Sequence, residues 1–514
     1  MQQQPESIPL LTLPHLQDLY ATEQLTPSQL VKTIAGNLAS RGDDGIWITT
    51  LAIAALLARA DELESIAPAQ RQHYPLWGIP FSVKDCIDVA GLPTSAACPA
   101  FAYEATQTNP VIQALMDAGA ILIGKTNLDQ FATGLVGIRT GYTVPHNAFS
   151  KDYMPGGSSS GAALSVAVGL VSFAIGTDTG GSGRVPAAMN NIVGLKPTRG
   201  LLSTRHTVEA CKTLDCLSIF ALTATDADTV FQLTQGLDPD HPFSRDPALQ
   251  PQPLPVYNAS QSFRFGVPRP EQRKFFGNGE VKTRYEAAIA TLTALGGTCT
   301  EIDYTPFLQA NELLFNGAWV AERYASVGRF VEANPAAAFP ITQQILMQAK
   351  TLTAVEAFEG LYAVEALKRT VQPLWEAIDC LVVPTTGTAY RIDEIEADPL
   401  RLNANLGYYT NFVNLLDLAA IALPNGFQAN GIPTGITFIA PPWHEAYLVA
   451  LGTAFHQQQD IQLGATACTT QHLAPLTDFD ALRKHGNLKR KIPSHWQRFR
   501  GVALALLRSH ARRV

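Results

Sequence analysis

The sequence predicts an α/β protein with a single large domain, built on a mostly parallel, mixed sheet that helices cover on both faces. Three observations support this prediction. Strand-like apolar runs alternate with helix-like segments along most of the 514 residues, the order that parallel sheets require. No internal repeat interrupts this order. A buried, glycine-rich stretch at residues 154–186 lies within it and carries the residues that suit chemistry.

The first two helices are marked by their end signals and their apolar faces. Thr26 and Gln29 form a predicted capping box, Pro27 occupies the first helical position, and Gly42 is a stop signal. A second helix is expected at residues 50–65, where the apolar side chains cover one side. We expect that side to pack on the sheet.

The elements that follow alternate between strand and helix. Residues 76–83 are a continuous apolar run, typical of a buried strand that delivers Lys84. A helix at 109–118, a strand at 121–124 and a short helical turn at 128–134 come next. The sequence therefore predicts two neighbouring strands before the glycine-rich stretch.

The glycine-rich stretch carries one serine near each end, Ser158 and Ser182. Residues 162–175 between them are small and apolar, which predicts a buried helix followed by a short strand. One buried element thus sets the distance between two loops. The later strand and helix signals are at 193–200, 217–222, 265–268, 281–294, 299–302, 379–386 and 421–439. The proline-rich residues 238–255 fit a subdomain boundary and an ordinary surface loop equally well.

Composition excludes several classes of protein. The net charge of −7 argues against a dedicated nucleic-acid binder. The seven cysteines are scattered without a C-x-x-C pair, and no histidine or cysteine cluster has metal-ligand spacing, so we expect reduced thiols, no metal and no cofactor. The amino terminus lacks a secretory pattern and no apolar run reaches the ~18 residues of a membrane span. We expect a soluble, cytoplasmic protein.

Ser182 is the better candidate nucleophile. It follows two glycines, and bare backbone N–H groups in such a turn can stabilise an oxyanion. A serine needs a base, and Lys84 at the end of a buried strand can serve because burial lowers the pKa of an ammonium group. Ser158 would relay the proton between them. The expected oxyanion donors are the N–H groups of Thr179, Gly180, Gly181 and Ser182, and Asp178 and Arg184 are expected to brace the loop.

Two shorter motifs compete with this interpretation. Residues 119–126 match the phosphate-loop pattern G-x-x-x-x-G-K-[ST], but the four intervening residues are themselves a predicted strand, so the match is accidental. Residues 157–161 match the nucleophile elbow G-x-S-x-G, which needs an apolar strand before it, and residues 147–153 are not one.

The combination of Lys84, Ser158 and Ser182, with the serines 24 residues apart, resembles the Ser-cisSer-Lys triad of the amidase signature family. The resemblance implies a single amidase-signature domain, a cis peptide bond before Ser158, and amide hydrolysis by Ser182 attack, Ser158 relay and Lys84 base. A general amidase and a glutaminase-type subunit of an amidotransferase would share this triad, although the latter would need a partner chain. A non-catalytic interaction protein would be expected to have lost a triad residue, and none is lost.

Within this family the chain is most similar to the allophanate hydrolases, in which a tyrosine and an arginine eight residues apart hold the substrate carboxylate. Arg323 occupies the arginine position, whereas Phe315 occupies the tyrosine position, and Gly180 stands where an alanine is common. The resemblance implies hydrolysis of allophanate in urea degradation, release of ammonia, and a urea carboxylase that supplies the substrate. It also leaves a homodimer open. The similarity is carried by residues 91–101, 126–134, 190–203, 215–220 and 410–424.

The carboxyl-terminal residues differ in character from the rest. From Arg483 to Val514 there are ten lysines and arginines and no acidic residue. We therefore expect the amidase domain over residues 1–464 and a basic tail over 465–514, in place of the separate C-terminal domain of full-length relatives.

Overall fold

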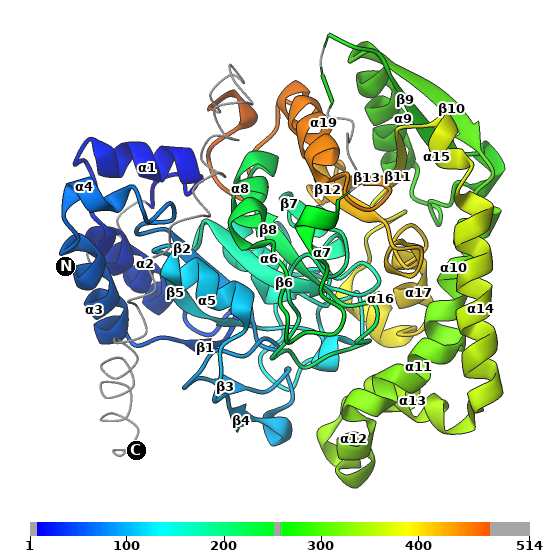
Figure 1. Cartoon of the computed structure of the whole chain (residues 1–514), viewed down its shortest axis with the longest axis horizontal. Helices are drawn as coiled ribbons and strands as arrows, with labels where there is room; N and C mark the ends of the chain where they lie inside the picture. Colours follow the sequence, from blue (N-terminus) through cyan, green and yellow to red (C-terminus); the bar gives the residue numbers. More distant parts are fainter. Residues whose placement is uncertain (1–7, 251–256, 259, 473–514) are drawn as a thin grey trace.

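An eleven-stranded sheet runs through the computed structural model, which describes residues 8–250, 257–258 and 260–472 (Figure 1). The strand order is β1-β5-β2-β6-β8-β7-β12-β13-β11-β9-β10. These strands are β1 (Trp47–Thr50), β2 (Pro80–Lys84), β5 (Ile121–Thr126), β6 (Phe173–Asp178), β7 (Val193–Lys196), β8 (Cys216–Ala221), β9 (Phe263–Pro268), β10 (Gly297–Ile302), β11 (Cys380–Pro384), β12 (Ala419–Phe427) and β13 (Pro433–Ala440). A separate ribbon pairs β3 (Pro93–Thr94) with β4 (Tyr103–Glu104).

Helices precede, separate and follow these strands. The first are α1 (Leu13–Ala21), α2 (Pro27–Arg41), α3 (Ile53–Glu64), α4 (Pro68–Arg71), α5 (Pro110–Asp117), α6 (Ser160–Ala167), α7 (Val185–Met189), α8 (Ala224–Thr234) and α9 (Gly279–Ala294). The later ones are α10 (Thr305–Asn316), α11 (Ala318–Arg323), α12 (Arg329–Ala333), α13 (Pro340–Met347), α14 (Ala354–Val371), α15 (Leu374–Ala377), α16 (Ile392–Ala397), α17 (Arg401–Leu406), α18 (Phe412–Leu415) and α19 (Glu445–Gln458).

The sheet is mixed, as predicted, but its parallel part is smaller than expected. Strands β5, β2 and β6 are parallel neighbours, and so are β11, β9 and β10. The central strands pair antiparallel instead. For β12 and β13 the physical reason is the connection, because the turn between them is too short for the crossover that parallel neighbours need.

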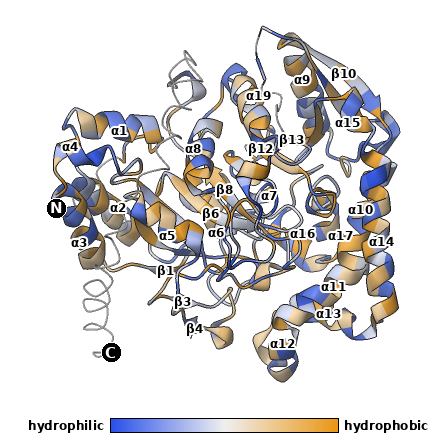
Figure 2. Cartoon of the chain, in the orientation of Figure 1, coloured by the Kyte–Doolittle hydropathy of each residue, from blue (hydrophilic) through white to orange (hydrophobic). Residues whose placement is uncertain are grey.

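Both faces of the sheet are covered, as predicted. Along β11, Cys380 and Val382 join the large apolar cluster that also contains residues of α8, α9 and α19. Leu381 and Val383 point the other way, into a cluster with residues of α10 and α18. Period-two alternation between two apolar layers is what a sheet with helices on both faces requires. Figure 2 shows the hydrophobic colour on central strands such as β6.

The end signals predicted for the first helix are present in α2. In α2 the backbone N–H of Gln29 donates to Thr26 Oγ1 at 3.3 Å, and the Gln29 side chain accepts from the Thr26 N–H at 2.9 Å. Gly42 follows with φ +64°. The strand predicted from residue 76 begins only at Pro80, because Trp77 donates back to Tyr74 O and Gly78 has φ +75°. The residues of this apolar run before Pro80 belong to a packed turn, and only the residues from Pro80 on form the strand.

The proline-rich residues 238–255 do not divide the fold. Strands β8 and β9, on either side of them, belong to the same sheet. The described part of the segment rests on the body, with the Arg245 N–H donating to Gly200 O at 2.8 Å. The described residues 238–250 therefore form a surface loop.

The predicted tail lies only partly within the described residues. Residues 465–472 hydrogen-bond to the body, for example through the Ala465 N–H and Ala167 O at 2.7 Å. Residues 473–514 lie outside the described part of the chain. Within that part, no helix combines the length and the apolar character needed to cross a membrane.

Candidate active site

The loop that carries Ser182 is organised by one buried carboxylate. Strand β6 ends at Asp178, whose carboxylate accepts hydrogen bonds from the N–H groups of Gly181 at 2.9 Å and Gly183 at 3.0 Å. Arg184 donates two further bonds to the same carboxylate, both at 2.9 Å, and both side chains are inaccessible to solvent. Burial alone would raise the pKa of Asp178, but Arg184 and the other donors hold it below its ordinary value.

The segment around α18 holds this loop from the other side. Arg184 donates to Thr410 O at 3.1 Å, and Thr410 Oγ1 donates to Gly180 O at 2.8 Å. Asn414 Nδ2 donates to Asp178 O at 2.7 Å. The structure therefore brings the predicted bracing pair together and adds Thr410 and Asn414, which sequence reasoning missed because they lie more than 200 residues away.

Three of the four predicted oxyanion donors are available. In the described part of the chain, the N–H groups of Thr179, Gly180 and Ser182 donate to no protein acceptor. The N–H of Gly181 is different, because it donates to Asp178. The sequence did not predict this hydrogen bond, because it depends on the conformation of the loop that follows β6.

The glycines are required by close approaches. A Cβ on Gly181, where φ is +133°, would lie 2.5 Å from Thr410 Oγ1. A Cβ on Gly180 would lie 2.6 Å from Leu314 Cδ2 of α10. Gly180 therefore lets α10 pack directly on the loop that carries Ser182.

Lys84 is the last residue of β2 and is completely buried. Its Nζ donates to Ser158 Oγ and to Thr177 Oγ1, both at 2.7 Å. Burial lowers the pKa of Lys84, while Cys86, Asp129 and other nearby acidic groups oppose this effect. Thr177 was missed by sequence reasoning, because its contact with Lys84 follows from the parallel pairing of β2 with β6.

Ser158 lies in a second tight loop beside the first. The peptide bond from Gly157 to Ser158 is cis, at the position that the resemblance implied. A Cβ on Gly156 would lie 2.9 Å from Pro186 Cα of α7, so this loop contacts the helix that follows Ser182. The structure thus brings Lys84 and Ser158 into direct contact and packs the Ser158 loop against the helix that follows Ser182.

Asp129 supports the Ser158 loop and was not predicted. Its N–H donates to Ser158 O at 3.0 Å, and its buried carboxylate accepts from the N–H groups of Val136, Gly137 and Arg139. Burial raises the pKa of Asp129, and Arg139 opposes this shift. In the sequence, Asp129 could be recognised only as a polar residue within the turn predicted at 128–134.

Arg323 ends α11 and is 4% exposed. Its Nε and Nη1 atoms have no hydrogen-bond partner among the described residues. The guanidinium carbon lies 5.5 Å from the ring centre of Phe315, so the predicted pair is in contact. Buried donors without partners are rare in proteins and favour a ligand at that position.

Asp215, just before β8, connects Arg323 with the nucleophile loop. Its carboxylate accepts a hydrogen bond from Thr179 Oγ1 and bonds from the N–H groups of Ala210 and Cys211. Burial raises the pKa of Asp215 to about 6, while the Thr179 hydroxyl, the backbone donors and Arg323 oppose this rise. The Asp215 carboxylate therefore contacts Thr179 and is also stabilised electrostatically by Arg323.

The chain is similar to known amide-cleaving proteins. A family model described as Amidase matches residues 38–449. The urea amidolyase of Saccharomyces cerevisiae is 41% identical over 416 residues, which is 80% of this chain and 22% of that protein. The chain spans about a fifth of the length of the urea amidolyases that it matches.

Two further similarities concern shorter proteins. A subunit of the glutamyl-tRNA(Gln) amidotransferase of Acidobacterium capsulatum is 30% identical over 440 residues, covering 78% of this chain and 89% of that one. The solved structure of Kluyveromyces lactis allophanate hydrolase has a TM-score of 0.81 and 37% identity, and the match covers 87% of this chain and 72% of that one.

Proposed function

Because the chain belongs to the amidase family, we propose that it hydrolyses a linear amide or ureide, and specifically allophanate, with release of ammonia. The observation that carries the choice of substrate is the buried Arg323 guanidinium without a hydrogen-bond partner. Buried guanidinium donors without hydrogen-bond partners are unfavourable, and a substrate carboxylate would supply those partners. Allophanate carries a carboxylate at one end and a carboxamide at the other.

In the proposed first step, Ser182 Oγ attacks the carboxamide carbon. Its proton passes to Ser158 Oγ while Ser158 passes its own proton to neutral Lys84. The 2.7 Å contact between Lys84 and Ser158 supports this relay, and burial supports the neutral lysine. The oxyanion then receives N–H donors from Thr179, Gly180 and Ser182, where each donor is typically worth about 2.7–4 kcal/mol of barrier.

In the second step the carbon–nitrogen bond breaks, and the leaving nitrogen takes the proton back from Lys84 through Ser158, so ammonia leaves. Water then attacks the acyl-enzyme, with Lys84 accepting its proton through the same relay. Ser182 is regenerated, and the released product has a carboxylate at both ends. Asp178 and Arg184 touch no reacting atom in this scheme and keep the loop in shape.

Two alternatives keep the same triad. The similarity to an amidotransferase chain favours a glutaminase-type protein, and Phe315 in place of a tyrosine favours a general amidase on another small amide. A general amidase acting on an uncharged amide does not explain the unpartnered Arg323, whereas glutamine, which also carries a carboxylate, would satisfy it, so only the substrate comparison separates glutamine from allophanate. Ammonia release from allophanate, biuret, malonamate and glutamine should separate them. Turnover of allophanate at least tenfold above the other three supports the proposal, whereas preference for glutamine or for uncharged biuret contradicts it.

We also propose that a urea carboxylase supplies the allophanate, in keeping with the urea amidolyases among the relatives. Urea itself should then yield no ammonia with this protein alone. Ammonia release from urea in the absence of a carboxylase would contradict this proposal.

We propose a homodimer through α14. This helix exposes four large apolar side chains, between 45% and 68% accessible, namely Val355, Phe358, Leu361 and Tyr362. Glu356 and Glu359 lie in its amino-terminal half, and Lys368 and Arg369 lie in its last turns. Antiparallel pairing of two copies about a two-fold axis would bring acidic and basic ends together around this apolar face.

A further inference from the structure

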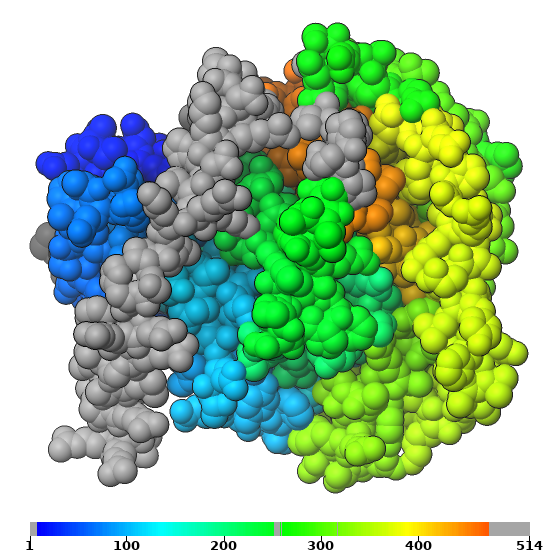
Figure 3. Space-filling model, in the orientation of Figure 1, coloured from blue at the N-terminus to red at the C-terminus, as the bar shows by residue number. Residues whose placement is uncertain are grey.

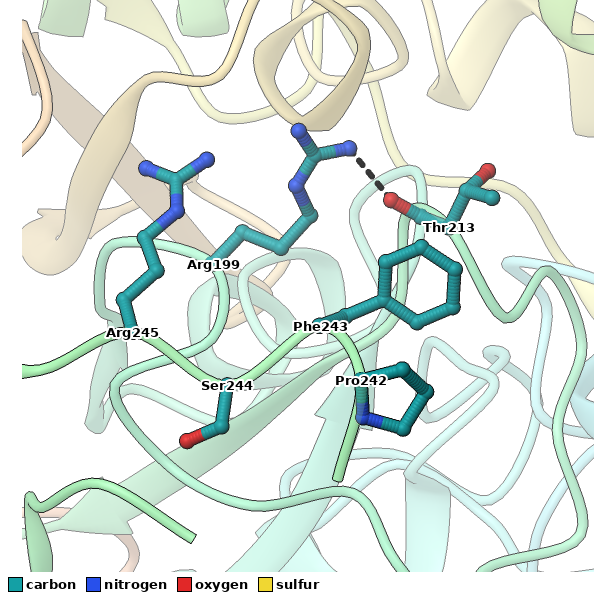
Figure 4. A pocket seen from close by; sticks show the side chains of 6 residues that line it. All are labelled: Arg199, Thr213, Pro242, Phe243, Ser244 and Arg245. Carbon is teal, nitrogen blue, oxygen red and sulfur yellow. Dashed lines mark hydrogen bonds between the residues drawn. The ribbon is translucent and has the colours of Figure 1, made fainter. Parts of the chain in front are cut away.

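A cavity of about 320 Å³ lies beside Thr213, two residues before Asp215 in the sequence (Figure 4). It is lined by Arg199, Thr213, Pro242, Phe243, Ser244 and Arg245. None of Lys84, Ser158, Ser182 and Arg323 is among these residues, so the cavity is distinct from the candidate active site. Two arginines in one small cavity are the feature that needs a physical reason.

The positive charge of the two arginines is only partly balanced. Arg245 Nη2 lies 2.7 Å from Asp417 Oδ2. Arg199 Nε lies 3.7 Å from Asp417 Oδ1, too far for a hydrogen bond, and Asp417 Oδ1 accepts none among the described residues. A single carboxylate therefore faces two guanidinium groups, which leaves one positive charge in excess.

Most guanidinium donors of this pair are also uncommitted. Besides these contacts, Arg199 Nη1 donates to Thr213 O, and each arginine carries five N–H donors. The arginine side chains are 20% and 28% exposed, so solvent screens their charges less than it would at an open surface. Figure 4 shows the side chains of Arg199 and Arg245 extending toward the same side, away from Ser244 and Pro242.

Other charged groups near the cavity make no ion pair with either arginine among the described residues. The Glu322 carboxylate accepts from the Thr213 N–H at 2.9 Å and from Thr213 Oγ1 at 2.8 Å. Lys212 is paired with Glu209 at 3.1 Å. In the described part of the chain, Asp417 is therefore the carboxylate that pairs with Arg199 and Arg245.

We propose that this cavity is a second anion site, in which Arg199 and Arg245 bind a small oxyanion such as a carboxylate, bicarbonate or phosphate. The planar guanidinium fork matches two oxygens of such a group. Thr213 connects this site to the candidate active site, because its carbonyl accepts from Arg199 while its N–H and hydroxyl hold Glu322, the neighbour of Arg323. An anion here would thus contact Arg199, which hydrogen-bonds to Thr213, and Thr213 in turn holds Glu322, the residue next to the proposed substrate arginine.

The test is the thermal unfolding midpoint of the full chain, titrated separately with sodium bicarbonate, sodium malonate and sodium phosphate against sodium chloride of equal ionic strength. We expect a saturable rise with at least one of the three oxyanions beyond the chloride effect, and the most stabilising oxyanion identifies the ligand class. Arg245→Gln and Arg199→Gln should each weaken this binding by at least about tenfold, because each removes charge-assisted hydrogen bonds. Arg245→Lys keeps the positive charge and loses the planar fork, so its anion affinity should lie between those of the wild type and Arg245→Gln. It also provides a test if a glutamine variant does not fold.

Two control variants distinguish binding in this cavity from binding at arginines elsewhere in the protein. Arg264→Gln removes a surface arginine that is 49% exposed and paired with Asp379 at 3.0 Å, and it should leave anion binding unchanged. Arg323→Gln should keep the stabilisation that the Arg199 and Arg245 variants lose, while impairing allophanate hydrolysis. Equal stabilisation of the wild type and the Arg199 and Arg245 variants would overturn the proposal, and so would loss of binding in Arg323→Gln alone, which would assign the anion to the candidate active site.

Discussion

At the scale of single residues, the proposed chemistry depends on a lysine that, among the residues the structure describes, has no carboxylate in hydrogen-bond contact. Lys84 Nζ contacts two hydroxyl oxygens, those of Ser158 and Thr177, in a completely buried site. Hydroxyl partners stabilise the ammonium form less than a paired carboxylate would, so desolvation lowers the lysine pKa. This environment suits a base that must be neutral before each turnover.

The first prediction at this scale concerns the triad. Ser182→Ala should abolish turnover, and Lys84→Ala and Ser158→Ala should each reduce kcat by several orders of magnitude, because members of a triad act as a unit. The double variant Ser182→Ala/Lys84→Ala should be no worse than the single ones. Ser160→Ala, in the same segment, is the matched control and should remain active. Full activity of a folded Ser182→Ala protein would show that the nucleophile is misassigned.

The second prediction concerns substrate recognition. Arg323→Gln should lower kcat/KM on allophanate by about 10- to 100-fold, since a charge-assisted hydrogen bond is worth about 1.5–3 kcal/mol. Phe315→Tyr adds a hydroxyl beside Arg323 and should raise kcat/KM by up to about tenfold. Steady-state kinetics on allophanate and on an uncharged amide give the comparison. An equal loss on both substrates in Arg323→Gln would contradict carboxylate recognition.

At the scale of elements, helix α8 carries a carboxylate at a cost in stability. Asp226 is buried in its first turn, and its Oδ2 has no partner among the described residues. Burial raises the pKa of Asp226 to about 7, with a hydrogen bond from Thr223 opposing the shift. Between about pH 4 and 7 the folded protein therefore keeps a proton that the unfolded chain releases, so the free energy of unfolding falls as pH rises through this window.

The third prediction follows from this helix. Asp226→Asn should unfold at a higher temperature than the wild type at pH 8, with a gain on the order of 2–4 kcal/mol, and the gain should vanish near pH 4. Thermal unfolding between pH 4 and 8 measures it. Asp228→Asn, on the same helix and half-buried, is the control. A gain that is the same at pH 4 and pH 8 would show that the ionisation of Asp226 is not its cause.

At the scale of the whole molecule, α14 lies at the outer edge, opposite the amino-terminal helices α1 to α4 (Figures 1 and 3). Its inner side packs on α11, where Gly360 approaches Ala318 closely enough that a Cβ would lie 3.4 Å away. The outer side carries the exposed apolar residues. A helix that contacts the body on one side and exposes Phe358 and Tyr362 on the other is typical of a protein interface.

The fourth prediction is that the protein is a dimer in solution and that Phe358→Glu/Tyr362→Glu makes it a monomer, because the new charges would be desolvated in the apolar interface. Light scattering coupled to size-exclusion chromatography gives the mass. Leu249→Glu, at a residue 78% exposed elsewhere on the surface, should leave the dimer intact. A wild type that is monomeric at micromolar concentration would rule this interface out.

The elements of the fold were largely predictable, because they depend on short-range signals. The capping box of α2, the helix and strand between the two serines, and the strand ending at Lys84 follow from local pattern. The start of that strand was misplaced, since burial alone cannot tell a packed turn from a strand. The share of parallel pairing was overestimated, because the order of strands along the chain does not determine which of them become neighbours.

For the site, the sequence by itself determined the chemical groups, and the tertiary structure decided their contacts. Lys84, Ser158 and Ser182 could be chosen from residue type and glycine setting, as could the pair Asp178 and Arg184. The contact of Lys84 with Thr177, the support from Asp129 and the lack of a hydrogen-bond partner for the buried Arg323 arise only when distant strands and loops meet. Hydrogen-bond partners are set by three-dimensional proximity and burial, which chain order does not encode locally.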